Sequence, residues 1–288
     1  MCSRKNFWAI VAFVGLFSFG PCALAQKPQS QPSSPPSTPA ASPTSQSMEN
    51  SNNNNAQPPE PVKQPSKEEN KAIKSFRGIS PSDGDKKTQS GEEFLQKYPD
   101  SGYRPEVIAW LASAYTRKGQ IDKLQAEGDK ELAMPHPNPA SLAALGSNLA
   151  RAVNNNTPDE QKKLDQAEQL CKKSLELLGS SQKPENVAQD KFDTLKNETS
   201  ALAYSGLGTA AFRRGHFGDA ANNLQQAVKF GSKDPVDYYV LGKAEEAQTN
   251  YSEAFTAYTK CAATPSGMQA PCEQSAKEMK SHGAILLK

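Results

Sequence analysis

The stretch Gly206-Leu207-Gly208-Thr209-Ala210-Ala211 has the residue types and spacing of a phosphate-binding turn, with the loose form G-x-G-x-x-A. Arg213 and Arg214 follow it. In a dinucleotide-binding turn, the glycines stand between a strand and the start of a helix, where they let the backbone approach a pyrophosphate. The preceding residues 190–198 are polar and helical in pattern. We therefore predict that these glycines lie inside a helix and bind no nucleotide.

Other residues capable of catalysis or metal binding are sparse. The three histidines, His136, His216 and His282, are never four residues from one another or from a cysteine, so no metal-ligand spacing is present. The sequence contains neither a G-x-S-x-G elbow nor a G-x-x-x-x-G-K-[ST] loop. Acidic pairs such as Glu92-Glu93 and Glu245-Glu246 stand near basic residues, which is typical of solvated helix faces. We expect no enzyme, no catalytic residue, no metal and no cofactor.

The first residues have the pattern of a secretory signal peptide. Arg4 and Lys5 precede a largely apolar run from residue 7 to residue 20, and the sequence Ala23-Leu24-Ala25 follows. The apolar run is shorter than the roughly 20 residues that a membrane-spanning helix needs. We predict cleavage after Ala25, a periplasmic or secreted protein, and no transmembrane segment in the mature chain.

The charge balance argues against polyanionic partners. The 288-residue chain has 33 basic and 31 acidic side chains, and loss of residues 1–25 removes two basic ones and no acid. The mature chain would therefore carry a formal net charge of zero, which attracts neither nucleic acid nor an anionic membrane by bulk electrostatics. We expect no nucleic-acid partner.

Residues 26–70 are rich in Pro, Ser, Gln and Asn and include the run 52–55 of four asparagines. Almost no branched or aromatic side chain is present to bury, so this composition predicts a disordered tether. The remaining residues are numerous enough for one sizeable folded unit.

The rest of the sequence is helical in pattern and contains an internal repeat of 34 residues. Tyr204-x-x-Leu207-Gly208 recurs as Tyr238-x-x-Leu241-Gly242, and Ala220 recurs as Ala254. Leu111-Ala112 and Leu145-Gly146 extend the series upstream. Residues 154–158 and 179–200 interrupt the strict period, and a helix beginning near 184–186 should run into the third unit.

These positions resemble the tetratricopeptide repeat (TPR), a helix-turn-helix unit. The resemblance implies an all-α solenoid of about four repeats over 105–288, with a capping helix from Pro271, and a degenerate helical pair over 71–104. The ending Phe94-x-x-x-Tyr98-Pro99-x-Ser101 is similar to TPR proteins of bacterial envelopes, including outer-membrane-protein assembly lipoproteins.

Small residues at the eighth and twentieth repeat positions let the two helices of a pair approach closely, and each pair buries its apolar face against its neighbours. Gly206 is interpreted as a mere neighbour of this contact. The predicted packing residues are Gly146, Gly208, Gly242, Ala220 and Ala254.

The resemblance also implies a concave groove lined by the first helix of each pair. Arg117, Arg151 and Arg213 share the thirteenth position, and we add Phe212, Tyr239 and Lys243 as groove residues. Such guanidinium groups are suited to the carboxylates of an acidic or C-terminal peptide. Alternatively, these cations simply complement helix dipoles. A chaperone-type carboxylate clamp is disfavoured, because its positions are Ala109, Ser113 and Ala144.

Three cysteines remain after residue 25. Cys171 occupies a core position of the repeat, which favours a buried, inert thiol. Cys261 and Cys272 are close enough in sequence for a disulfide that would fix the terminal helix, and two free thiols are the alternative.

Together these features predict a non-catalytic scaffold of the bacterial envelope that binds a partner protein or peptide in its groove. The alternatives are a recruiting or regulatory subunit of a cell-wall enzyme and an accessory in outer-membrane-protein assembly.

Overall fold

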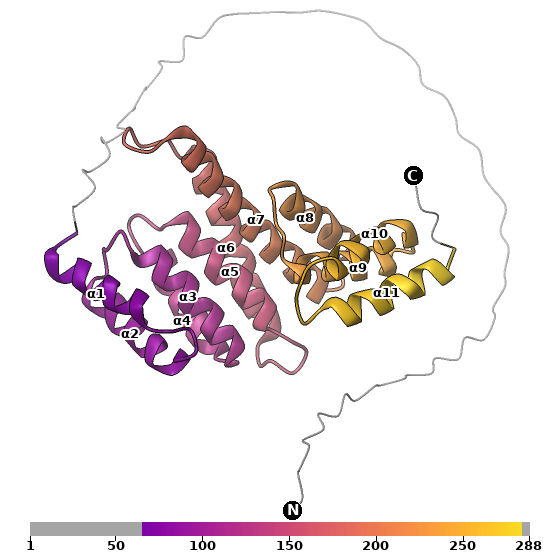
Figure 1. Cartoon of the computed structure of the whole chain (residues 1–288), viewed down its shortest axis with the longest axis horizontal. Helices are drawn as coiled ribbons and strands as arrows, with labels where there is room; N and C mark the ends of the chain where they lie inside the picture. The colour runs from indigo at the N-terminus through magenta and orange to yellow at the C-terminus, as the bar shows by residue number, and fades with distance from the viewer. Residues whose placement is uncertain (1–64, 284–288) are drawn as a thin grey trace, which may run out of the picture. The chain divides into compact units, whose positions relative to one another are not determined.

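The computed structural model describes residues 65–283, which form eleven α-helices and contain no strand (Figure 1). The all-α prediction is therefore confirmed for this part of the chain. The predicted signal peptide and residues 26–64 of the predicted tether lie outside the described residues. The helices are α1 (Lys67–Gly78), α2 (Gly84–Lys97), α3 (Arg104–Arg117), α4 (Ile121–Leu132), α5 (Pro139–Ala152), α6 (Glu160–Ser180), α7 (Gln189–Arg213), α8 (Phe217–Lys229), α9 (Pro235–Ala247), α10 (Tyr251–Ala262) and α11 (Gln269–Ser281).

Consecutive helices pack as pairs, and the pairs follow one another from α1 to α11 (Figure 1). The first helices of successive pairs also touch, since α5 packs against α3 and α7, and α7 packs against α9. Because each helix buries its apolar stripe against several neighbours, the core runs along the stack. The helices α3, α5, α7 and α9 thereby form one continuous face.

Local signals in the sequence explain where these helices begin and turn. Asn138 caps α5 and Asp234 caps α9 through their side chains, and a proline follows each cap at the first helical position. The turns inside three pairs need a left-handed residue, at Gly119 (φ 64°), Gly215 (φ 77°) and Thr249 (φ 63°). These three residues share one repeat position, and only Thr249 has a side chain that strains there.

Three helix boundaries differ from the sequence prediction. The capping helix α11 begins at Gln269 rather than at Pro271. Residues 67–70, assigned to the tether, lie in α1, because Ser66 and Glu69 form a reciprocal capping box at its start. Helix α7 runs into the third unit as expected, but it begins at Gln189 rather than near residue 184.

Helix α7 approaches its neighbours through two glycines on different sides. A Cβ added at Gly208 would lie 2.5 Å from Leu224 Cγ on α8. One added at Gly206 would lie 2.9 Å from Ser147 Cα on α5 and 2.5 Å from the Cys171 sulfur on α6. The interpretation of Gly206 as a mere neighbour is therefore wrong, because it is a backbone contact in its own right.

The other small residues at the repeat contacts are equally enclosed. A Cβ at Gly146 would lie 2.6 Å from the Cys171 sulfur, and one at Gly242 would lie 2.5 Å from the Tyr258 ring. Ala220 and Ala254 are fully buried. These contacts leave no room for a larger side chain, so they set the spacing of the helices.

We predict that Gly208→Ala destabilises the protein by about 1–3 kcal/mol, because the added methyl group overpacks the contact with Leu224. Gly179→Ala is the matched control, since a Cβ there meets nothing within 4 Å in the last turn of α6. That change should stabilise the protein by about 0.5–1 kcal/mol. Urea unfolding of both variants measures the difference, and equal effects would contradict the contact.

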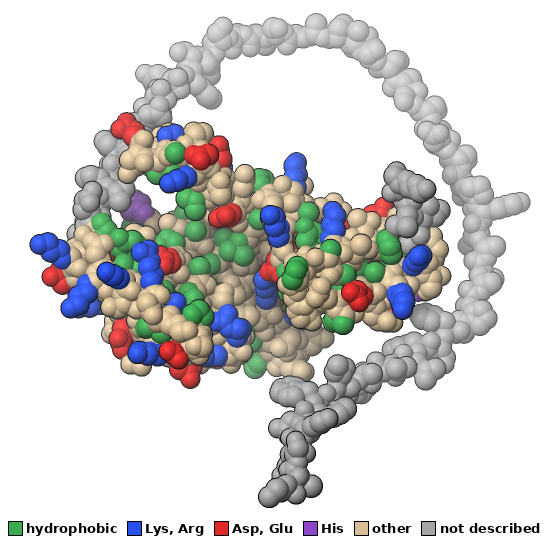
Figure 2. Space-filling view, in the orientation of Figure 1, with side chains coloured by type: hydrophobic (Ala, Val, Ile, Leu, Met, Phe, Trp, Pro, Cys, Tyr) green, Lys and Arg blue, Asp and Glu red, His purple; other side chains and the backbone are tan. Residues whose placement is uncertain are grey.

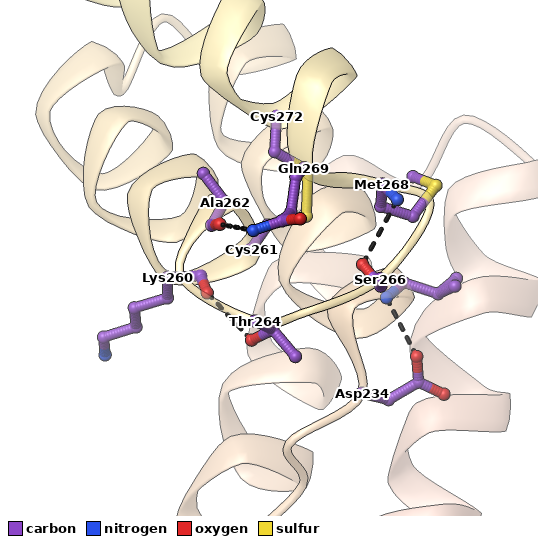
Figure 3. Close-up of a disulfide and its surroundings, with 10 residues drawn as sticks. Asp234, Lys260, Cys261, Ala262, Thr264, Ser266, Met268, Gln269 and Cys272 are labelled. Atoms are coloured by element: carbon purple, nitrogen blue, oxygen red, sulfur yellow. Dashed lines mark hydrogen bonds between the residues drawn. A yellow bond between two sulfur atoms is a disulfide. The ribbon is translucent and has the colours of Figure 1, made fainter.

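A disulfide fixes the last helix to the stack. Cys261 at the end of α10 and Cys272 in the first turns of α11 are bonded, with their Cα atoms 5.8 Å apart (Figure 3). Between the two cysteines, Gln269 at the start of α11 donates a hydrogen bond to the carbonyl of Ala262 at the end of α10, and Thr264 donates one to the carbonyl of Lys260. Both cysteines are fully buried, so the bond is a structural staple.

We expect Cys261→Ala/Cys272→Ala to lower the free energy of unfolding by about 3 kcal/mol, the chain-entropy value for so short a loop. Reductant should destabilise the wild type and leave this double variant unchanged. Mass spectrometry of peptides prepared without reductant should find the two cysteines linked, and recovery of unlinked peptides would refute the staple.

Candidate functional site

A hollow of about 540 Å³ lies on the face formed by α3, α5, α7 and α9. The structure brings five of the six predicted groove residues to it, namely Arg117, Arg151, Phe212, Arg213 and Tyr239. Sequence reasoning missed the other side chains that line it, which are Ser113, Thr116, Asn148, Thr209, Val236 and Val240.

Arg117 and Arg213 are the accessible cations of the hollow. Each is the last residue of its helix, α3 and α7 respectively, and each side chain is exposed. Within residues 65–283 neither guanidinium group has an ion pair or hydrogen bond to another side chain. Since arginine stays protonated at all ordinary pH values, the hollow has two positive charges that are free to meet a ligand.

Arg151 differs from these two arginines, because its charge is already used within the protein. Its Nη1 lies 2.7 Å from Asp234 Oδ2 and its Nη2 lies 2.9 Å from Asp237 Oδ1. The Nη2 also donates to Ser205 Oγ at 2.9 Å. The prediction that Arg151 presents a guanidinium fork to a partner's carboxylate is therefore wrong, since both terminal nitrogens have partners.

The Arg151 network joins three first helices of the solenoid. Arg151 comes from α5, Ser205 from α7 and Asp237 from α9, and Ser205 in turn donates to Asp237 at 2.5 Å. Ser232 donates to the second oxygen of Asp237, also at 2.5 Å. Burial lowers the pKa of Arg151, but Asp237 and Asp234 outweigh that effect and the net shift is upward. The buried carboxylate of Asp237 is thus fully satisfied.

Lys243 does not line the hollow, although it was predicted as a groove residue. Its ammonium group pairs with Glu246 at 3.0 Å and lies over the rings of Tyr239 and Tyr258. Burial raises the pKa of Glu246, but hydrogen bonds from Tyr258 and Lys243 bring it below its usual value. Lys243 therefore supports the wall behind Tyr239.

The wall of the hollow is apolar on the α7 and α9 side. Phe212 packs against Phe217 with ring centroids 5.6 Å apart, and Tyr239 packs against Tyr258 at 5.8 Å. Val236 and Val240 complete this side. Aromatic walls beside free arginines are typical of protein-binding surfaces.

The buried Cys171 thiol is chemically inert. Burial raises the pKa of the Cys171 thiol to about 12, so it stays protonated at neutral pH and is a poor nucleophile.

No group of three or more His, Cys, Asp and Glu side chains in residues 65–283 is placed to hold a metal ion. Nor is any helix there both long and apolar enough to span a membrane. Figure 2 shows acidic and basic side chains interspersed over the face in view.

The paired helices, with glycine contacts 34 residues apart at Gly208 and Gly242, decide the type of architecture. The described chain has a TPR-like fold. No family model matches the chain, and no curated protein matches it. Among solved structures, a thermophilic TPR protein of Thermus thermophilus is similar, at 17% identity and a TM-score of 0.48. That match covers 76% of this chain and all of the other.

We predict that Arg151→Leu destabilises the TPR-like stack by about 3–5 kcal/mol, because it leaves the 2% exposed Asp237 side chain without a counter-ion. The matched control is Arg77→Leu, which breaks an ion pair with Glu106 in which both side chains are more than 40% exposed. Its effect should be small, because water and salt screen an ion pair at the surface. Thermal and urea unfolding compare the two variants, and equal effects would show that the Arg151 network does not stabilise the stack.

Proposed function

We propose that this protein is a non-catalytic scaffold that holds a segment of a partner protein in the hollow. The segment carries a carboxylate, which Arg117 and Arg213 receive, and an apolar side chain, which rests against Phe212 and Tyr239. The partner class is an acidic peptide whose carboxylate is an Asp or Glu side chain within the segment.

The observation that carries this proposal is the pair of exposed arginines without partners at one hollow. Surface cations commonly gain an acidic neighbour on the same helix, as Lys172 does with Glu168. Arg117 and Arg213 have none within residues 65–283, although both stand where a helix dipole favours a cation. The dipole explains their position, but it does not explain an apolar hollow between them.

The same proposal places the protein in an oxidising compartment outside the cytoplasm. The signal-peptide pattern of residues 1–25 supports export, and the Cys261–Cys272 disulfide is the kind of bond that such compartments maintain. A bacterial envelope is the setting that fits both features. In that setting, the partner would be a protein of cell-wall synthesis or of outer-membrane-protein assembly.

The test measures binding of the mature protein to short synthetic peptides by fluorescence anisotropy. One library has Asp at the centre with apolar residues on either side, and a matched library has Asn in place of Asp. The wild type should prefer the Asp peptides, and Arg117→Ala/Arg213→Ala should weaken their binding about tenfold or more, since each charged hydrogen bond contributes about 1.5–3 kcal/mol.

The control variant is Lys191→Ala/Lys277→Ala, which removes the same charge from exposed positions outside the hollow. It should bind the Asp peptides like the wild type, which separates the site from bulk electrostatics. An equal loss in both double variants, or no preference for Asp over Asn, would refute the proposed function.

A further inference from the structure

Helix α11 is attached to the rest of the solenoid through α10. It packs along that helix and, within residues 65–283, against no other helix to a comparable extent. Its buried side chains are Cys272, Ser275, Ala276 and Met279. Beside the disulfide, Ala276 and Met279 are therefore its buried apolar contacts, and a helix of 13 residues is marginal in water by itself. The bond between Cys261 and Cys272 is thus the main attachment of α11 (Figure 3).

The side chains beneath α11 reach as far as the hollow. One apolar cluster buries the side chains of Ala254, Tyr258, Ala276 and Met279. Tyr239 on α9 packs against this cluster, with its ring centroid 5.8 Å from that of Tyr258. Tyr239 also lines the hollow. A continuous series of contacts therefore leads from α11 through Tyr258 to the apolar wall of the hollow.

Tyr258 of α10 is held between α9 and α11. A Cβ at Gly242 would lie 2.5 Å from its ring, so the ring lies directly on α9. Its hydroxyl donates to Glu246 at 2.6 Å, and the Lys243 ammonium group lies over its ring and that of Tyr239. Tyr258 is fully buried, and α11 supplies part of that burial. Loss of α11 would expose one side of Tyr258 and loosen the packing that fixes Tyr239.

Resting on the proposed function, we infer that the Cys261–Cys272 disulfide controls the affinity of the hollow by holding α11 against Tyr258. The chain with two thiols keeps its two exposed arginines, but its Tyr239 wall is loosened and it binds the acidic segment weakly. Oxidation passes two electrons and two protons from the thiols to a disulfide oxidant, which becomes a dithiol. The new S–S bond then completes the wall, so strong binding is limited to the oxidised protein.

The test compares the wild type with Cys261→Ala/Cys272→Ala at a temperature at which both remain folded. The probe is the tightest peptide of the Asp-centred library, measured by fluorescence anisotropy. We expect the double variant to bind about fivefold more weakly. The loss should lie in faster dissociation, because the arginines that attract the peptide are unchanged. Wild type folded and kept in a dithiol should match the double variant, which should itself not respond to the dithiol.

Two further variants separate this coupling from a general loss of stability. Ile73→Ala removes a buried side chain from α1, at the other end of the stack, and should leave the affinity unchanged. Tyr239→Ala removes the last member of the series of contacts. In that background, loss of the disulfide should have little further effect on binding, as a double-mutant cycle requires of residues that act together.

Hydrogen exchange provides a measurement that needs no peptide. Loss of the disulfide should speed amide exchange in α11, α10 and the part of α9 around Tyr239, and should leave α3 to α6 unchanged. Met279→Ala weakens the packing of α11 without touching the cysteines, so it should produce the same pattern. It replaces the double variant in both measurements if that variant does not fold.

The outcomes separate the coupling from the proposed function. Unchanged affinity without the disulfide, together with weaker binding in Arg117→Ala/Arg213→Ala, overturns the coupling alone. Faster exchange confined to α11 also overturns it, since α9 would then not depend on the cap. If no library peptide binds the wild type, the proposed function is wrong, and the control of affinity is wrong with it.

Discussion

Helix α7 touches α5 on one side and α8 on the other at points where its own residues have no side chain. Gly206 faces the backbone of Ser147, and Gly208 faces Leu224. Because a Cβ at either position would come within 3 Å of a neighbour, the axis of α7 is fixed relative to both helices. Thr209, Phe212 and Arg213 follow within two turns on the same helix. The position of these three hollow residues thus depends on the two glycine contacts.

Burial assigns different roles to three arginines that share one repeat position. Arg151 is enclosed near Asp234 and Asp237, and an unpaired charge there would be strongly unfavourable. Its ion pairs therefore belong to the protein's own stability. Arg117 and Arg213 stand at the rim, where water solvates them and no partner is required. Arginine at this position therefore stabilises the fold in one helix pair and carries an unpaired, exposed charge in the two others.

The sequence was sufficient to predict the fold and much of the hollow, for reasons that particular residues make clear. Gly208 and Gly242 identified the helix contacts, because only a repeated steric requirement keeps a glycine inside a helix. Phe212, Arg213 and Tyr239 followed from repeat positions alone. Thr209 was not among the predicted groove residues, which were all charged or aromatic.

Other features were beyond the sequence because they depend on pairs of residues distant in the chain. Asp237 stands 86 residues after Arg151, and no local pattern indicates that the two meet. Gly206 contacts α5, which belongs to the preceding unit, whereas the repeat rule described the contact within a pair. The pairing of Lys243 with Glu246 is local, but its place over Tyr239 and Tyr258 depends on how α10 packs on α9.

In the proposed function, the Arg151 network and the two exposed arginines, Arg117 and Arg213, together determine how a ligand would be recognised. The Arg151 network and the glycine contacts hold the helices that line the hollow in place. A segment that binds there therefore need not order the hollow first. Arg117 and Arg213 are long, exposed side chains, and in the proposed binding mode their charge would act before contact by attracting an acidic segment. Arg117 and Arg213 should therefore govern the association rate and its dependence on salt, while contacts inside the hollow govern the dissociation rate. If the proposed function holds, a hollow divided in this way would reject a neutral peptide already at encounter.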